Sequence, residues 1–206
     1  MKQLLKNSMT LTVALLVLTA CGTTKVVDTW QSETIQPETP EKVAVLVAWP
    51  DDPQRLVIER DAVAKLREKG ANAVESSELP GMRGKLTREN VEIALRNANV
   101  DAVIIVFIIG GGQGPTYERS DYWVQNVGTG VGGWYSPYFY DVYTVREGPG
   151  WADKVTELML ETVYVDVRRI ERVWSIVTQS DDLEYQDVAG KLTDRIISQM
   201  KKAGQI

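Results

Sequence analysis

The chain has 206 residues, a formal net charge of −5, one cysteine and no histidine. The lack of histidine excludes Ser-His-Asp and Cys-His catalysis, together with any metal site built on imidazole ligands. An acidic chain without a visible basic stripe is a poor candidate for nucleic-acid binding, because neutralisation of phosphates supplies most of that affinity. By the same reasoning it gains nothing from anionic lipid headgroups.

The first twenty-one residues are arranged as a secretory signal. Lys2 and Lys6 precede an apolar run from Met9 to Leu18, which falls well short of the roughly 20 residues that a membrane-spanning helix needs. The motif Leu18-Thr19-Ala20-Cys21 follows and resembles the lipobox of bacterial lipoproteins. An ordinary signal peptide with a chance cysteine is the alternative interpretation.

The lipobox resemblance makes Cys21 the predicted lipidation site and the mature N-terminus. It implies a thioether-linked diacylglycerol and an amide-linked acyl chain such as palmitate, enough lipid to anchor a domain stably. Cys21 is the only cysteine, so it has no partner for an internal disulfide. Inner-membrane lipoproteins commonly carry Asp at the next position, so Gly22 points to the outer membrane, with the domain in the periplasm.

The predicted organisation is a signal peptide over residues 1–20, a polar tether over 21–41 and a single α/β domain over 42–206. Within the tether, the patch Val26-Val27-Asp28-Thr29-Trp30 is too apolar for a free linker. We expect that it adds an edge strand, which would shorten the tether.

The first half of the domain predicts alternating strands and helices. Residues 43–49 are continuously apolar, which is typical of a strand covered on both faces. A helix over 53–69, a short strand over 72–75, a helix from Thr87 and a buried strand over 102–109 follow. This β-α-β-α-β order implies a parallel sheet with right-handed crossovers.

The second half begins with a glycine and aromatic insertion at about 110–150, in which 138–145 could be a strand. Alternation over 155–168 and 172–178 predicts an antiparallel hairpin with one half-exposed face. After Ser180-Asp181-Asp182 comes a last helix that ends near Ala203-Gly204. The predicted fold is therefore α/β and three-layer-like: a parallel half, then an antiparallel hairpin and a C-terminal helix.

The chain resembles a family of uncharacterised bacterial envelope lipoproteins whose α/β domain is interrupted by a glycine/aromatic loop. The matching residues are Cys21 followed by Val26-Val27-Asp28-Thr29-Trp30, Lys42-Val43-Ala44-Val45-Leu46-Val47, Glu59, Lys69-Gly70-Ala71-Asn72-Ala73, Ser76, Asp101-Ala102-Val103 and Val173-Trp174-Ser175. The resemblance implies a fold and a location. It implies no activity, because the family has none assigned.

A rim at the carboxyl ends of the parallel strands is one candidate site, since ligands of open α/β sheets bind there. Asp51, Asp52, Ser76 and Gln113 would lie near it, with Glu78 close by, and their oxygens could hold a cation or a polar ligand. Helix capping by Asp52 and solvated turns are the plainer interpretation. The glycines after residue 109 lack the lysine of a Walker loop and the pattern of a dinucleotide fingerprint, so no cofactor is predicted.

The aromatic cluster between Tyr117 and Tyr140 is the second candidate, with Tyr117, Trp123, Trp134 and Tyr138 as its representatives. Aromatic side chains among glycines suit contact with sugars, peptides or a protein partner, because they give contact area at low entropic cost. They could equally pack onto the domain. Trp174 alternates within a predicted strand and is expected in the core.

These observations predict a membrane-anchored envelope lipoprotein with a noncatalytic structural or docking role. Its expected partners are the membrane, through the N-terminal lipid, and possible envelope proteins or cell-wall components. A small-ligand binding domain that uses the strand-end rim is the alternative.

Overall fold

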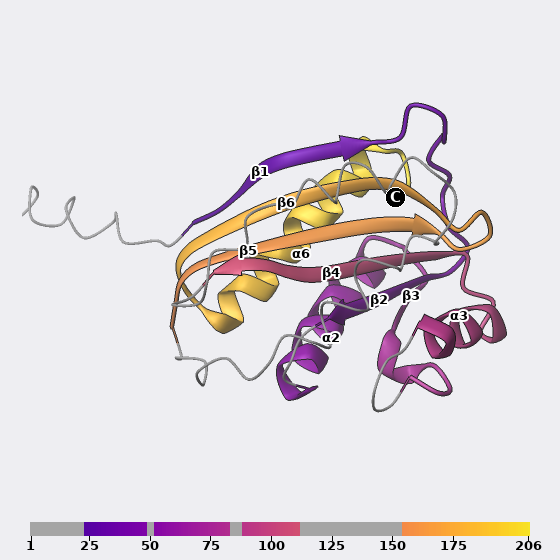
Figure 1. The fold of residues 1–206 in the computed structure, drawn as a ribbon, viewed down its shortest axis with the longest axis horizontal. Coiled ribbons are helices and arrows are strands. Elements are labelled where there is room, and N and C mark those ends of the chain that lie inside the picture. The colour runs from indigo at the N-terminus through magenta and orange to yellow at the C-terminus, as the bar shows by residue number, and fades with distance from the viewer. Residues whose placement is uncertain (1–22, 49–51, 83–87, 112–153) are drawn as a thin grey trace, which may run out of the picture.

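The computed structural model describes residues 23–48, 52–82, 88–111 and 154–206. They form one six-stranded mixed sheet in the order β1-β6-β5-β4-β2-β3 (Figure 1). The strands are β1 (Thr23–Gln31), β2 (Val43–Ala48), β3 (Ala73–Glu75), β4 (Ala102–Gly111), β5 (Lys154–Asp166) and β6 (Glu171–Glu184). The helices are α2 (Asp52–Glu68), the short 3₁₀ helix η2 (Ser76–Glu78), α3 (Arg88–Asn97) and α6 (Tyr185–Lys202).

The predicted parallel half is confirmed. β2 pairs in parallel with β3 on one side and with β4 on the other. Alternate residues of β2 enter two different core clusters: Val43, Val45 and Val47 pack with residues of α2 and α6, whereas Ala44 and Leu46 pack with residues of α3. Helices therefore cover both faces of this strand, which explains why its sequence does not alternate.

The predicted hairpin of β5 and β6 is present, but the expectation that one of its faces is half-exposed was wrong. Thr162 and Tyr164, which lie on the supposed exposed side, are 0% and 2% exposed. The reason is that α6 covers them: Tyr164 stacks on Trp174 with 5.3 Å between ring centroids, and both belong to the core cluster that includes α6 residues. The prediction that Trp174 lies in the core is confirmed, and its indole N–H donates to Gln205 Oε1.

β6 also runs further than its sequence pattern predicted, to Glu184 instead of residue 178. The extension pairs with β5 on one side and with β1 on the other. Ser180 is buried there, with its hydroxyl 2.8 Å from that of Thr24. A polar sequence thus continues as strand because two neighbouring strands satisfy its backbone.

The edge strand expected in the tether is present as β1, which pairs antiparallel with β6. The pairing is shifted by one residue at Val27, a β-bulge. In the sequence, only Gly22 therefore lies between the predicted lipidation site Cys21 and the first residue of β1. The rest of the predicted tether, after Gln31, is also tied to the domain, beginning with the bond from Ser32 N–H to the Val173 carbonyl.

The sheet has two unlike ends. At one of them, here called the proximal end, β1 and β5 begin while β2, β3, β4 and β6 finish, as the pairing directions require. The other, here called the distal end, carries the β5–β6 turn and the C-terminus (Figure 1). The chain therefore enters the sheet at the end where the ligand rim was predicted.

Candidate functional site

The predicted rim is only partly within the described residues. Asp51 and Gln113 lie outside them, and Asp52 is the first residue of α2, with a side chain that is not described. Ser76 directly follows β3 as the first residue of η2 and is 0% exposed. Glu78 is exposed and forms an ion pair with Arg67 at 3.4 Å. The ligand-binding role of this rim stays a prediction.

The hydroxyl of Ser76 instead contacts a buried carboxylate that sequence reasoning gave no role. Glu59 of α2 is 0% exposed. Ser76 Oγ lies 2.8 Å from its Oε1 and 2.9 Å from its Oε2, and the backbone N–H of Val47 donates to Oε1 at 3.0 Å. One carboxylate thus joins the helix α2 to the ends of β2 and β3.

Burial raises the pKa of Glu59 above its ordinary value of 4.5. The hydrogen bonds from Val47 and Ser76, and the positive charge of Arg55, act in the opposite direction and lower it. Both hydrogen bonds come from the fold itself. This geometry suits a carboxylate that fixes the strand ends rather than one that meets a substrate.

The sequence does contain a pattern that predicts the burial of Glu59. Glu59 lies three and seven residues before Ala62 and Leu66, which are buried. This spacing puts all three on one face of a helix. A carboxylate on an apolar helix face predicts a buried polar partner, but nothing local identifies that partner as Ser76.

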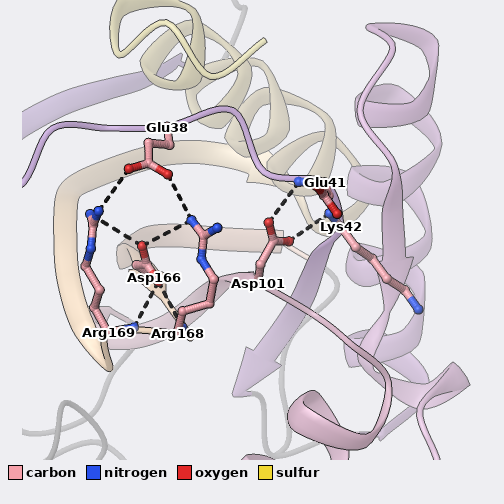
Figure 2. A network of polar contacts seen from close by, with 7 residues as sticks. All are labelled: Glu38, Glu41, Lys42, Asp101, Asp166, Arg168 and Arg169. Atoms are coloured by element: carbon pink, nitrogen blue, oxygen red, sulfur yellow. Dashed lines mark hydrogen bonds and ion pairs between the residues drawn. The ribbon is translucent and has the colours of Figure 1, made fainter.

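A second polar cluster lies at the distal end, on the β5–β6 turn (Figure 2). Asp166 accepts the backbone N–H groups of Arg168 and Arg169 at 2.9 and 3.0 Å, and so closes the turn. The two guanidinium groups reach Glu38 at 3.1 and 2.9 Å. Glu38 comes from the segment that follows β1, so the cluster holds that segment against the turn.

Asp101 extends this arrangement toward β2. Its carboxylate accepts the backbone N–H groups of Glu41 and Lys42 at 2.9 and 2.8 Å (Figure 2). Tyr164 lies in a small hollow beside Asp101 and Asp166. Burial, followed by these two negative charges, raises the pKa of Tyr164 above its ordinary value.

The remaining predicted positions lie outside the described residues. They are Cys21, Tyr117, Trp123, Trp134 and Tyr138. Across the ranges that the structure does describe, no group of three or more acidic or cysteine side chains is placed to hold a metal ion. No helix within those ranges is long and apolar enough to cross a membrane.

No protein-family model and no curated protein matches the chain. Among solved structures, a PelC dodecamer from Paraburkholderia phytofirmans is similar at 14% identity, covering 86% of this chain and 96% of that chain, with a TM-score of 0.44. Lipoprotein GNA1162 from Neisseria meningitidis is similar at 13% identity, covering 79% and 99%, with a TM-score of 0.42. These likenesses concern the fold.

Proposed function

We propose that this protein is a lipid-anchored envelope domain, held in the outer membrane by acylated Cys21, with a noncatalytic structural or docking role in the periplasm. The observation that carries the proposal is the short distance in sequence between the lipobox and the fold. β1 begins at Thr23, two residues after the cysteine. Two residues span at most about 7 Å, so the lipid would hold the domain directly against the bilayer.

The start of β1 is held to the rest of the domain by side-chain contacts as well as by strand pairing. Thr24 contacts Ser180 by its hydroxyl, and its carbonyl accepts a hydrogen bond from Arg195 Nη2 at 2.7 Å. Lys25 lies 3.8 Å from Asp181 of β6. These contacts add to the backbone ladder with β6, so a pull on Cys21 acts on the whole sheet.

A noncatalytic role agrees with the chemistry of the polar groups. The carboxylates of Glu59, Asp101 and Asp166 all accept backbone N–H groups of the domain. Such bonds stabilise the fold and leave the carboxylates poorly placed for proton transfer to a substrate.

The anchor is tested by fatty-acid labelling of the full chain in cells. Cys21→Ala should abolish the label, whereas the parent chain should carry it. The matched control is Cys21→Ala/Thr23→Cys, which restores one thiol but places it away from the processing site, and it should remain unlabelled. Persistent label on Cys21→Ala would contradict the proposal.

The docking role is tested by crosslinking the acylated protein in cells and identifying its neighbours. A photo-crosslinker at exposed Arg169 reports on the distal end, and one at exposed Asn97 reports on α3. A discrete, reproducible neighbour at either position supports docking. If both positions gave only diffuse products, the docking role would be contradicted and a structural role favoured.

A further inference from the structure

A small polar hollow, here called the distal hollow, lies between residues 36–40, the start of β4 and the end of β5. Its volume is about 10 Å³, which is about the space that one water-sized group needs. Its rim is solvent-exposed, since the side chains of Glu38 and Arg168 are 52% and 54% exposed. Its floor is buried, since Tyr164 is 2% exposed. A ligand could therefore enter over the rim and place one small polar group on the floor.

The phenol hydroxyl of Tyr164 faces this hollow. The ring stacks on Trp174, and no hydrogen bond joins the hydroxyl to another group within the described residues. After burial, the charges that most raise the pKa of Tyr164 are those of Asp101 and Asp166, which both line the hollow. A buried hydroxyl without a partner destabilises a fold, so this one favours a ligand that can satisfy it.

Two of the three carboxylates at the hollow are neutralised by arginines. Glu38 pairs with Arg168 at 3.1 Å and with Arg169 at 2.9 Å. Asp166 lies 3.5 and 3.6 Å from the same two guanidinium groups. The charge of Asp166 is the first cause that raises the pKa of Arg168, and that of Asp101 is a smaller one. These two arginines and two carboxylates therefore form a group of four with no net charge, which does not include Asp101.

Asp101 carries the charge that this group leaves uncompensated. Its two oxygens each accept one backbone N–H, from Glu41 and from Lys42 (Figure 2). Both donors are neutral, and among the described residues no lysine or arginine forms an ion pair with Asp101. The ammonium of Lys42 donates instead to the Ala98 carbonyl at 2.9 Å. Each oxygen of Asp101 keeps a lone pair, so the hollow offers a negative charge beside a phenol.

A primary ammonium group suits this arrangement better than a metal ion does. A metal ion such as Ca²⁺ needs about six to eight oxygen ligands at about 2.3–2.6 Å, and no group of three acidic side chains in the described ranges is placed to supply them. An ammonium group donates three hydrogen bonds over about 2.7–3.2 Å. It could donate to Asp101 and to the phenol oxygen of Tyr164, and its charge would offset that of the carboxylate.

We propose that the distal hollow binds a primary ammonium group, with the Asp101 carboxylate and the Tyr164 phenol oxygen as its acceptors. The group comes from a lysine side chain of a partner protein or from a small amine. The hollow lies at the opposite end of the sheet from the start of β1 (Figure 1), so an anchored domain would present it away from Cys21. The site needs only the folded domain, so the inference goes beyond the proposed function and does not depend on acylation.

The test is urea unfolding of the full chain in methylammonium chloride and in tetramethylammonium chloride at equal ionic strength. Methylammonium has three N–H donors, whereas tetramethylammonium has the same charge and none. Methylammonium should lower the unfolding equilibrium constant about elevenfold at a concentration ten times its Kd, and tetramethylammonium should leave it unchanged. Nα-acetyl-lysine methylamide separates the two sources: tighter binding than methylammonium indicates a lysine of a partner, and equal or weaker binding indicates a small amine.

Variants assign the effect to the hollow. Tyr164→Phe removes one acceptor and keeps the stack on Trp174, whereas Asp101→Asn removes the charge, so each should reduce the effect of methylammonium several-fold. Glu171→Gln removes the same charge from an exposed residue at the start of β6 and should respond like the parent chain. The inference is overturned if the two salts act alike on the parent chain, or if either Tyr164→Phe or Asp101→Asn keeps the parent's full response.

Discussion

Glu59 offers the sharpest test of the energetic reasoning, because a single side chain satisfies two buried donors. Glu59→Ala removes the acceptor for the N–H of Val47 and for the hydroxyl of Ser76. A buried donor left without a partner costs about 1–3 kcal/mol. The desolvation penalty of the parent carboxylate disappears at the same time, so we expect a loss of about 2–3 kcal/mol in the free energy of unfolding.

Glu59→Gln isolates the charge from the hydrogen bonds. It keeps a carbonyl oxygen as acceptor, so its cost should be well below that of Glu59→Ala. Because the pKa of Glu59 is raised in the folded state, the folded chain binds its proton more tightly than the unfolded chain. Its contribution to stability is therefore fully present below pH 4.5 and is lost as the pH rises through the folded pKa.

The assay is urea unfolding of the parent chain and both variants at a series of pH values from acid to neutral. The stability of the parent relative to Glu59→Gln should fall as the pH rises above 4.5 and then level off. Glu68→Gln, an exposed carboxylate at the end of the same helix, is the control and should follow the parent. A Glu59→Gln profile parallel to that of the parent, or a Glu59→Ala chain as stable as the parent, would refute the reasoning.

Two further predictions concern the hairpin. Asp166→Asn should lower the free energy of unfolding by about 1–3 kcal/mol, because a charged acceptor for the N–H groups of Arg168 and Arg169 becomes neutral. Glu38→Gln, which touches only their exposed guanidinium groups, should change it by less than about 1 kcal/mol in the same urea titration; equal effects would contradict the distinction. Thr162→Val should raise the free energy of unfolding by about 1 kcal/mol and the Tm by about 2–4 °C in calorimetry, because the buried Thr162 hydroxyl has no hydrogen-bond partner among the residues that the structure describes. A lower Tm would show that this hydroxyl has a partner.

The sequence could predict the features that depend on residues near one another in the chain. Continuous apolar runs identified β2 and β4, and the parallel half followed from their order with the helices. Trp174 was expected in the core and is 0% exposed. The hairpin was expected too, but the burial of its supposedly half-exposed face was not, because α6 packs over β5 from a later part of the chain.

The candidate sites depend even more on residues that are far apart in the chain. The rim was inferred from strand ends, yet the described polar contact there is between Ser76 and Glu59, seventeen residues apart. The distal cluster joins Glu38 to Arg168 across 130 residues. The helix-face position of Glu59 predicts a buried polar partner but does not identify Ser76. Glu38 and Arg168 have the sequence context of ordinary surface charges, so no periodic pattern predicts that they pair.

By itself, the sequence determined most of the strand and helix order and excluded imidazole chemistry, and it predicts a leader with a lipobox, because each of these depends on residue type and short spacing. Only the tertiary structure decided that β1 pairs with β6, that Glu59 accepts hydrogen bonds from Ser76 and Val47, and that Arg195 of α6 donates to the Thr24 carbonyl of β1. These features arise from contacts between segments up to 171 residues apart. Packing of the whole chain selects such contacts, and their formation follows from burial and hydrogen bonding rather than from local pattern.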